Sequence, residues 1–146
     1  MAMVRVFVAG VPQPQGSARA FVRGRRAIVT TANPQLHGWR ELVTHGVHAA
    51  LPAEWRLLEG PVTVTLVFAL PKPPSVPKRR TVPTTRPDVD KLARAVLDAL
   101  TGLVFHDDAQ VVLLTAMKTY AADVPCGVTV IVGGLHDGHG AESGLR

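Results

Sequence analysis

Two pairs of aspartates are the residues of this chain best suited to carry chemistry. Asp88 and Asp90 are separated by one residue, and Asp107 and Asp108 stand side by side further along. Carboxylates gathered in one place raise one another's pKa unless a cation neutralises them. Oxygen ligands select hard ions such as Mg²⁺ or Mn²⁺, and such an ion activates water and stabilises charge on a phosphoryl group under attack. One interpretation of the four acids is therefore a metal centre for phosphoryl chemistry.

The same acids have simpler structural uses. Asp88 is placed to cap the N-terminus of a helix, and both it and Asp90 suit the positive end of a helix dipole. Aspartate is also common in tight turns, which would account for Asp107 and Asp108. Paired acids at both the start and the exit of one helix favour the metal centre, but the spacing alone leaves the capping interpretation open.

Between the acid pairs, Asp90, Arg94 and Asp98 recur every four residues and share one stripe of a helix. They form either a ladder of surface ion pairs, worth only ~0.3–0.5 kcal/mol per pair, or part of the site. In the second case Arg94 stands one helical turn from Asp90 and contacts the phosphate that is cut, with Lys91 beside it.

Charge is distributed unevenly along the chain. Residues 1–86 hold twelve Lys and Arg against three Asp and Glu, whereas residues 87–146 hold four against eight. A basic body around a local acidic cluster is expected of a metal-dependent enzyme that acts on a polyanion, although a solvated basic protein with one acidic helix has the same balance. The expected contacts to DNA phosphates are Arg19, Arg23, Arg25, Arg26, Arg79, Arg80, Arg86 and Lys91.

The elements that must position these residues follow from length and pattern. A chain of 146 residues, 47% of them hydrophobic, predicts one folded domain with a core of its own. Apolar residues at period two or at helical spacing predict, in order, strands at 4–8, 20–22 and 27–29, a helix that Asn33 caps and Pro52 ends, a strand at 62–70, a helix from Asp88 to Thr101, and strands at 110–120 and 127–132. This order predicts an α+β domain over residues 1–132, with a mixed or antiparallel sheet and both main helices on one of its faces.

Three segments complete the layout. Residues 20–29 are expected to form a hairpin with a basic tip, and the last two strands are expected to pair as a second hairpin. Residues 71–87 form a proline-rich basic loop without an acidic residue, and this loop leads into the second helix. Residues 133–146 are rich in Gly and His and are expected to be a flexible tail.

The helix from Asp88 to Thr101 is the element that must present the acids. Its apolar residues fall on one stripe: Val89, Leu92, Ala93, Val96, Leu97 and Leu100. Burial of this stripe turns the polar residues outward, and Gly102 ends the helix before Asp107 and Asp108. The connection that carries these two acids either folds back beside the helix start or meets the site of a second copy of the chain.

Other features indicate a soluble protein of the cytoplasm. The single cysteine excludes a disulfide framework within the chain. No targeting segment is expected, and the apolar run at 62–70 is too short to span a bilayer. His37, His45 and His48 do not share one helical face, so surface positions are expected for them and not a zinc site.

The acidic helix and its exit resemble the signature of the RusA family of Holliday junction resolvases. Residues 88–111 read Asp-Val-Asp-Lys-Leu-Ala-Arg-Ala-Val-Leu-Asp-Ala-Leu-Thr-Gly-Leu-Val-Phe-His-Asp-Asp-Ala-Gln-Val. The family pattern is Asp-x-Asp-Asn, then a lysine, then Asp-x-Leu, then Asp-Asp-x-Gln-Val. The resemblance implies a RusA-like fold and a bacterial or phage-encoded endonuclease that acts in DNA recombination and repair.

The resemblance also implies roles for individual residues. Asp88, Asp90 and Asp108 would be the essential carboxylates of the metal site, with Asp107 as a neighbour or supporting ligand. The family works with Mg²⁺, for which Mn²⁺ can substitute, and makes paired nicks in a four-way DNA junction as a homodimer. A two-fold dimer presents two equivalent sites to the two equivalent strands of a junction.

Two positions depart from the family pattern. Lys91 stands where the family has asparagine, and Arg94 stands where the family has lysine. Arginine stays charged where lysine can lose a proton. Arg94 is therefore expected to stabilise charge on the phosphate and not to donate a proton.

Two other functions fit the same residues. A metal nuclease that prefers flaps or forks would carry the same centre. A non-catalytic DNA-binding protein would carry the same basic surface, with its aspartates as helix caps or as ligands of a structural ion. Comparing cleavage of a junction, a flap and a linear duplex distinguishes the first alternative from a junction resolvase. DNA binding without any cleavage product identifies the second alternative.

Overall fold

The computed structural model describes residues 2–16, 19–30 and 33–135. Its main sheet has four strands in the order β1-β6-β4-β5, with bounds Met3–Ala9 for β1, Gly127–Gly134 for β6, Val62–Leu70 for β4 and Val111–Tyr120 for β5. β6 pairs antiparallel with both β1 and β4, whereas β5 runs parallel to β4. The sheet is therefore mixed, and the α+β prediction is confirmed.

The expected hairpin of the last two strands is wrong, because β4 lies between β5 and β6. β4 pairs with β5 along one edge and with β6 along the other, and every second residue from Val62 to Phe68 is fully buried. A parallel neighbour needs a crossover connection. The basic loop and the helix that follows it supply this crossover from β4 to β5, which explains why β5 does not pair with the strand that comes next.

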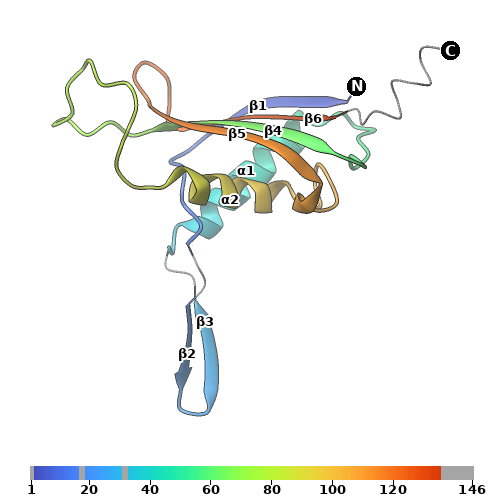
Figure 1. Ribbon diagram of the computed structural model, residues 1–146, viewed down its shortest axis with the longest axis horizontal. Coiled ribbons are helices and arrows are strands. Elements are labelled where there is room, and N and C mark those ends of the chain that lie inside the picture. Colours follow the sequence, from blue (N-terminus) through green and yellow to red (C-terminus); the bar gives the residue numbers. More distant parts are fainter. Residues whose placement is uncertain (1, 17–18, 31–32, 136–146) are drawn as a thin grey trace.

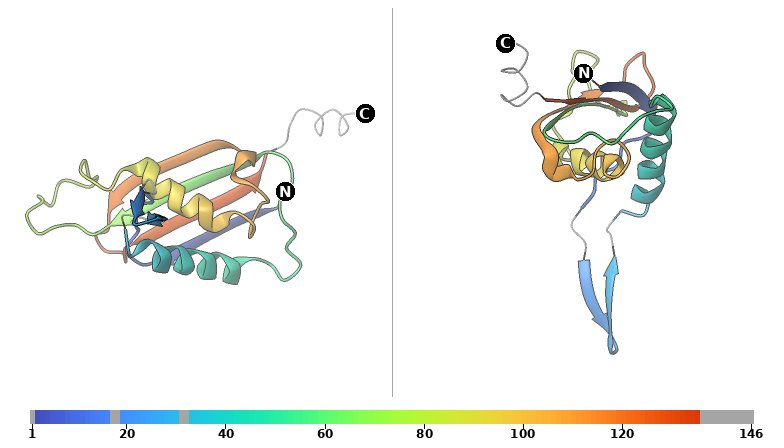
Figure 2. Two further views of the ribbon diagram at one scale, coloured as in Figure 1. Left: turned by 90° about the horizontal axis from the view of Figure 1, so that it is seen from below. Right: turned by 90° about the vertical axis from the view of Figure 1, so that its right-hand side faces the viewer.

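Two helices cover one face of the sheet (Figures 1 and 2). The first helix, α1, spans Leu36–Ala50, and the second, α2, spans Val89–Leu100. α1 begins two residues after the expected Pro34, because Pro34 and Gln35 form a turn. Asn33 still acts near this helix start, since its Oδ1 accepts a hydrogen bond from the Gln35 backbone N–H at 3.0 Å.

The core lies between the helices and the sheet. In α2 the predicted stripe packs inward, with Leu92, Ala93, Val96, Leu97 and Leu100 all buried. Burying an aliphatic side chain of this size stabilises the fold by roughly 1.5–3 kcal/mol. The stripe fixes the rotation of α2 about its axis and so turns Asp90 and Arg94 toward solvent.

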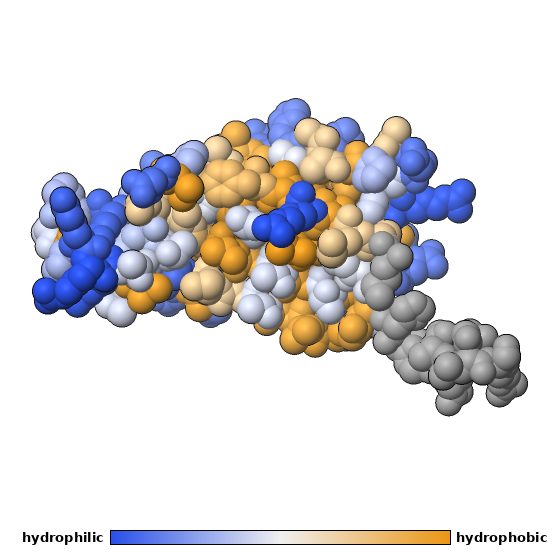
Figure 3. Space-filling model, turned by 90° about the horizontal axis from the view of Figure 1, so that it is seen from above, coloured by the Kyte–Doolittle hydropathy of each residue, from blue (hydrophilic) through white to orange (hydrophobic). Residues whose placement is uncertain are grey.

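Neither α1 nor α2 covers the opposite face of the sheet. Figure 3 views this face and shows apolar side chains over much of it. The exposed large apolar residues on it include Met3, Phe7, Leu113 and Met117, which the strand register places on one side of the sheet.

A separate two-stranded hairpin joins β2, Arg19–Arg23, to β3, Arg26–Thr30. It agrees with the expected hairpin, and Gly24 takes a positive φ of 66° at its tip. Figures 1 and 2 show that the hairpin leaves the molecule on the helix-covered side, next to the first turn of α2. Within the described residues, neither helix has the length and apolar character needed to cross a membrane.

The end of the chain differs slightly from expectation. β6 continues to Gly134, two residues beyond the expected strand, because Gly133 pairs with Met3 and Thr63 and Gly134 with Val62. The rest of the expected tail, from 136 onward, lies outside the described residues.

Candidate active site

Asp88 occupies the N-cap position of α2, with extended backbone angles of φ −72° and ψ 141°. Its side chain makes no capping hydrogen bond to the helix. The carboxylate is instead half exposed, and its Oδ2 lies 3.6 Å from the Lys91 ammonium. The capping interpretation therefore describes where Asp88 sits in the backbone but not what its carboxylate does.

Lys118 fixes the segment that leads into Asp88. This half-buried lysine of β5 donates to the carbonyl oxygens of Thr85 and Pro87, at 2.8 and 2.9 Å. Two carbonyls just before Asp88 are thereby tied to the sheet. Sequence reasoning missed Lys118, although a single lysine near the end of an apolar strand was a signal available in the sequence.

Gln110 fixes the exit turn that carries the second acid pair. Its Oε1 accepts from the backbone N–H groups of His106 and Asp107 at 2.9 and 3.0 Å. Its Nε2 donates to the carbonyls of Leu58 and Gly60, both at 2.9 Å. One side chain therefore closes the turn and attaches it to the segment before β4, a role that sequence reasoning did not assign.

Asp107 begins a short 3₁₀ helix, Asp108–Gln110, and caps it. Its Oδ1 accepts from the Ala109 backbone N–H at 2.9 Å. This bond first, and a hydrogen bond with Asp108 second, hold the pKa of Asp107 below its ordinary value. Asp107 thus stabilises the turn by capping the 3₁₀ helix, as aspartate often does in turns. Asp108 instead contacts α2.

Arg94 links the exit turn to the helix. Its Nη1 lies 2.5 Å from Asp108 Oδ2 and 3.6 Å from Asp98 Oδ1. The hydrogen bond to Asp108 is the main reason that the pKa of Arg94 is raised. The exit turn therefore folds back against α2 of the same chain, but at Arg94 in the middle of the helix and not beside the helix start as expected.

Asp90 belongs to α2, whereas Asp108 belongs to the exit turn. Asp90 is one helical turn before Arg94 and is exposed, and it forms no ion pair with Arg94 within the described residues. The expected ladder along α2 is thus reduced to the Arg94–Asp98 contact. In its place, Arg94 faces carboxylates from two different segments.

The four aspartates fit a hard cation by their chemistry, since all their donor atoms are carboxylate oxygens. They do not form a compact group in this structure. Among the described residues, no three His, Cys, Asp or Glu side chains stand close enough together to hold a metal ion. Asp88 and Asp90 mark the start of α2, Asp108 lies against Arg94, and Asp107 caps the turn.

Basic segments flank the start of α2. Arg25 and Arg26 are exposed at the tip of the hairpin, and Arg79, Arg80 and Arg86 are exposed on the loop before α2. Figure 1 shows the hairpin and this loop on two sides of the first turn of α2. Arg19 and Arg23 belong to β2, and Lys91 adjoins Asp88.

Comparison with known proteins adds to this geometry. The chain matches the family model described as endodeoxyribonuclease RusA over residues 11–132, which includes all four aspartates. It is also similar to the uncharacterized protein YqaN of Bacillus subtilis (strain 168), with 35% identity over 77 residues, 46% of this chain and 54% of that protein. The chain therefore spans about half the length of this curated relative.

Proposed function

The chain belongs to the RusA family of endodeoxyribonucleases, and on this premise we propose that it resolves Holliday junctions in DNA recombination and repair. It cuts by paired, Mg²⁺-dependent hydrolysis of phosphodiester bonds. The observation that carries the proposal is the contact of Arg94 with Asp108, which brings the second acid pair beside the helix that starts at Asp88. A site of this composition between basic segments suits a phosphodiester in a polyanion.

In this proposal Asp88, Asp90 and Asp108 hold the metal ion, and Asp107 supports them by fixing the turn. The bound ion supplies Lewis acidity toward the phosphoryl group and lowers the pKa of the attacking water. The side chains of Asp88 and Asp90 are exposed, so they can turn toward the ion without breaking any hydrogen bond made by the described residues.

Arg94 acts on the phosphate by charge. Its guanidinium is half exposed, and its raised pKa keeps it protonated throughout the physiological range. A fixed positive charge beside the scissile phosphate stabilises the negative charge that develops during hydrolysis. Proton donation is not part of this role, because an arginine does not lose its proton in proteins.

The basic segments hold the rest of the DNA. Arg25 and Arg26 on the hairpin, and Arg79, Arg80 and Arg86 on the loop, neutralise phosphates on either side of the site, as do Arg19, Arg23 and Lys91. Two copies of the chain form a two-fold dimer in the cytoplasm, because the four-way junction presents two equivalent strands to be cut.

The test compares a four-way junction, a flap and a linear duplex as substrates of the wild-type chain, with Mg²⁺ and with a chelator. We expect symmetric nicks in the junction, much slower cleavage of the other two DNAs and no product with the chelator. Faster cutting of the flap than of the junction would identify the chain as a metal nuclease that prefers other branched DNA, such as flaps or forks. Tight DNA binding without product in any divalent metal would identify a non-catalytic DNA-binding protein.

A further inference from the structure

A hollow of about 860 Å³ opens beside Asp88, at the end of the sheet where β4 and β5 finish. Leu70 and Tyr120, the last residues of these two parallel strands, both line it. Ligands of open α/β sheets bind outside the carboxyl ends of parallel strands. The volume also lies within the range of roughly 300–1,000 Å³ that is usual for small-molecule sites.

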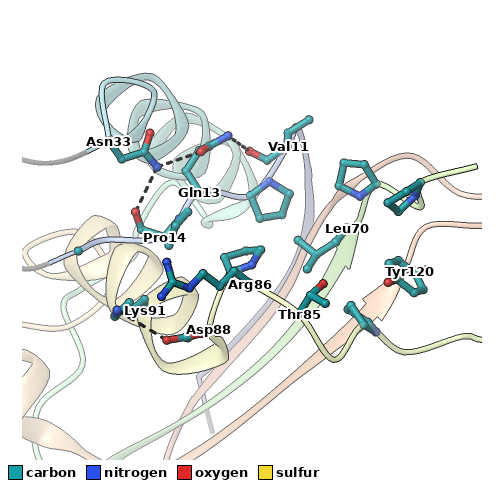
Figure 4. A pocket seen from close by; sticks show the side chains of 16 residues that line it. Val11, Gln13, Pro14, Asn33, Leu70, Thr85, Arg86, Asp88, Lys91 and Tyr120 are labelled. Atoms are coloured by element: carbon teal, nitrogen blue, oxygen red, sulfur yellow. Dashed lines mark hydrogen bonds and ion pairs between the residues drawn. The ribbon is translucent and has the colours of Figure 1, made fainter. Parts of the chain in front are cut away.

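The hollow has one apolar side and one polar side (Figure 4). Leu70 and Tyr120 lie on one side, together with proline rings from the basic loop. Gln13, Arg86 and Lys91 lie on the other, where the Arg86 guanidinium points toward the loop that holds Gln13. Flat apolar surfaces opposite hydrogen-bonding groups are complementary to a nucleobase, which has apolar faces and a polar edge.

The walls of the hollow are held in place by hydrogen bonds. The Gln15 backbone N–H donates to the Lys91 carbonyl at 3.0 Å, which ties the loop after β1 to α2. Asn33 Nδ2 donates to Gln13 Oε1 at 3.0 Å, which ties the same loop to the start of α1. On the other side, the Tyr120 backbone N–H donates to the Thr81 carbonyl at 2.8 Å. The hollow is therefore formed before any ligand arrives.

Two side chains in the hollow keep donors available. Arg86 makes no hydrogen bond or ion pair within the described residues. The amide nitrogen of Gln13 makes one long bond, 3.4 Å to the Val11 carbonyl. Asn33 is different, because its amide is already engaged with Gln13, Pro14 and Gln35. Arg86 and Gln13 can thus recognise a ligand, while Asn33 supports the wall.

We propose that this hollow binds the base of one nucleotide of the strand that is cut, next to the scissile phosphate. The inference rests on the proposed nuclease function, because Asp88 belongs both to the rim of the hollow and to the proposed metal site. The base enters against Leu70 and Tyr120, Gln13 contacts its edge, and Arg86 and Lys91 hold the neighbouring phosphate. A base leaves the stack most easily where the duplex is already disturbed, as it is at a branch point.

The first experiment tests binding without cleavage. Full-length protein is titrated with each of the four 2′-deoxynucleoside 5′-monophosphates, without metal, and backbone amide signals are followed by NMR. We expect shifts at Gln13, Arg86 and Tyr120. Tyr120→Phe keeps the ring and should bind as the wild type does, whereas Tyr120→Leu should bind about tenfold more weakly. Shifts confined to other surfaces, or equal binding by Tyr120→Leu, would overturn the proposal.

The second experiment tests the hollow during cleavage. Junctions with an abasic site at each position around the cut are compared with the intact junction. We expect one abasic position to slow the wild type and Tyr120→Phe by about tenfold, and to make no difference to Tyr120→Leu. An abasic effect that is equally large in Tyr120→Leu would contradict base binding here. If the wild type cuts no branched DNA at all, the nuclease proposal fails. The nucleotide titration still shows whether the hollow binds a nucleotide.

Discussion

At the scale of single residues, Arg94 holds the acids of the exit turn to α2. Its guanidinium contacts Asp108 from the turn and Asp98 from the helix. The forked guanidinium can bond two carboxylates at once, whereas a lysine ammonium acts as a point charge. Arginine at this position therefore joins helix and turn, and in the proposed function it also supplies charge to the phosphate.

We expect Arg94→Met to slow junction cleavage by about 100-fold, because a charge that stabilises the reacting phosphate is lost. The free energy of unfolding should fall by less than about 1 kcal/mol, because the Arg94 side chain is 51% exposed and the pair is screened by solvent. Single-turnover cleavage and urea denaturation measure the two effects. Arg56→Met, at an exposed position in the segment before β4, is the matched control. Equal cleavage by the two variants would contradict the role of Arg94.

Candidate residues for the chemistry can be picked out from the sequence more readily than the residues that support them. Asp88 and Asp90 are readable from their position before a strong apolar stripe. The contact between Arg94 and Asp108 is not, because it depends on how the exit turn folds. Lys118 and Gln110 act through backbone carbonyls and N–H groups of distant segments, and no spacing in the sequence reports such partners.

At the scale of elements, the exit turn is held by the side chain of Gln110. Its amide makes four hydrogen bonds, two within the turn and two to the segment before β4. Loss of the side chain would leave backbone groups at both places without their partner. The position of Asp108 relative to α2 thus depends on one residue outside the proposed metal site.

Gln110→Ala should lower the free energy of unfolding by roughly 0.5–1.5 kcal/mol, because four hydrogen bonds are lost, of which the one to the Leu58 carbonyl is partly buried. Gln110→Glu keeps the acceptor toward His106 and Asp107 but loses both donors, so its stability should fall between that of the wild type and that of Gln110→Ala. Urea denaturation at neutral pH gives the order. A Gln110→Ala chain as stable as the wild type would show that the turn holds its shape without this amide.

The hairpin of β2 and β3 is the element that carries basic residues farthest from the core. Replacing Arg25 and Arg26 by glutamine should reduce the slope of log binding constant against log salt by about one to two, since each lost phosphate contact contributes about 0.9. Junction binding in Ca²⁺ at several salt concentrations measures the slope. The double replacement of Arg5 and Arg56, which lie elsewhere on the surface, is the control. An unchanged slope in the hairpin variant would place the hairpin outside the DNA interface.

The positions of the helices and strands were predicted from the sequence more accurately than the pairing of the strands. The apolar stripe places α2 within one residue of its observed bounds, because burial of that stripe is what forms the helix. Period-two patterns locate β5 and β6 as strands but contain no information on which strands are neighbours. The parallel pairing of β4 with β5 follows from the long crossover through the basic loop and α2, and the hollow beside Asp88 exists because of that pairing.

At the scale of the whole molecule, charge and shape agree with a polyanionic substrate. The basic hairpin, the basic loop and the polar stripe of α2 all belong to the helix-covered side or to the end of the sheet beside it (Figure 1). Phosphates on both sides of a cut can therefore be held while one phosphodiester meets the acids. The proposed function places one such site on each chain, and two chains are then needed to cut both strands of a junction.

We expect the chain to be a dimer at the concentrations at which it cuts both strands of a junction. Light scattering should give twice the monomer mass of 15.6 kDa, and a junction held closed in a plasmid cruciform should be cut on both strands in one binding event. A monomeric mass together with paired cutting would contradict the two-fold arrangement.

The most direct test of the proposed metal-dependent nuclease activity is the behaviour of Asp90→Asn on a synthetic four-way junction in Mg²⁺. This change removes one carboxylate charge from an exposed side chain and leaves the core untouched. We predict junction binding like that of the wild type, with cleavage slower by about 1,000-fold or more. Asp123→Asn, an exposed aspartate in the loop between β5 and β6, should cut as the wild type does. Cleavage by Asp90→Asn at the wild-type rate would contradict the assignment of the site.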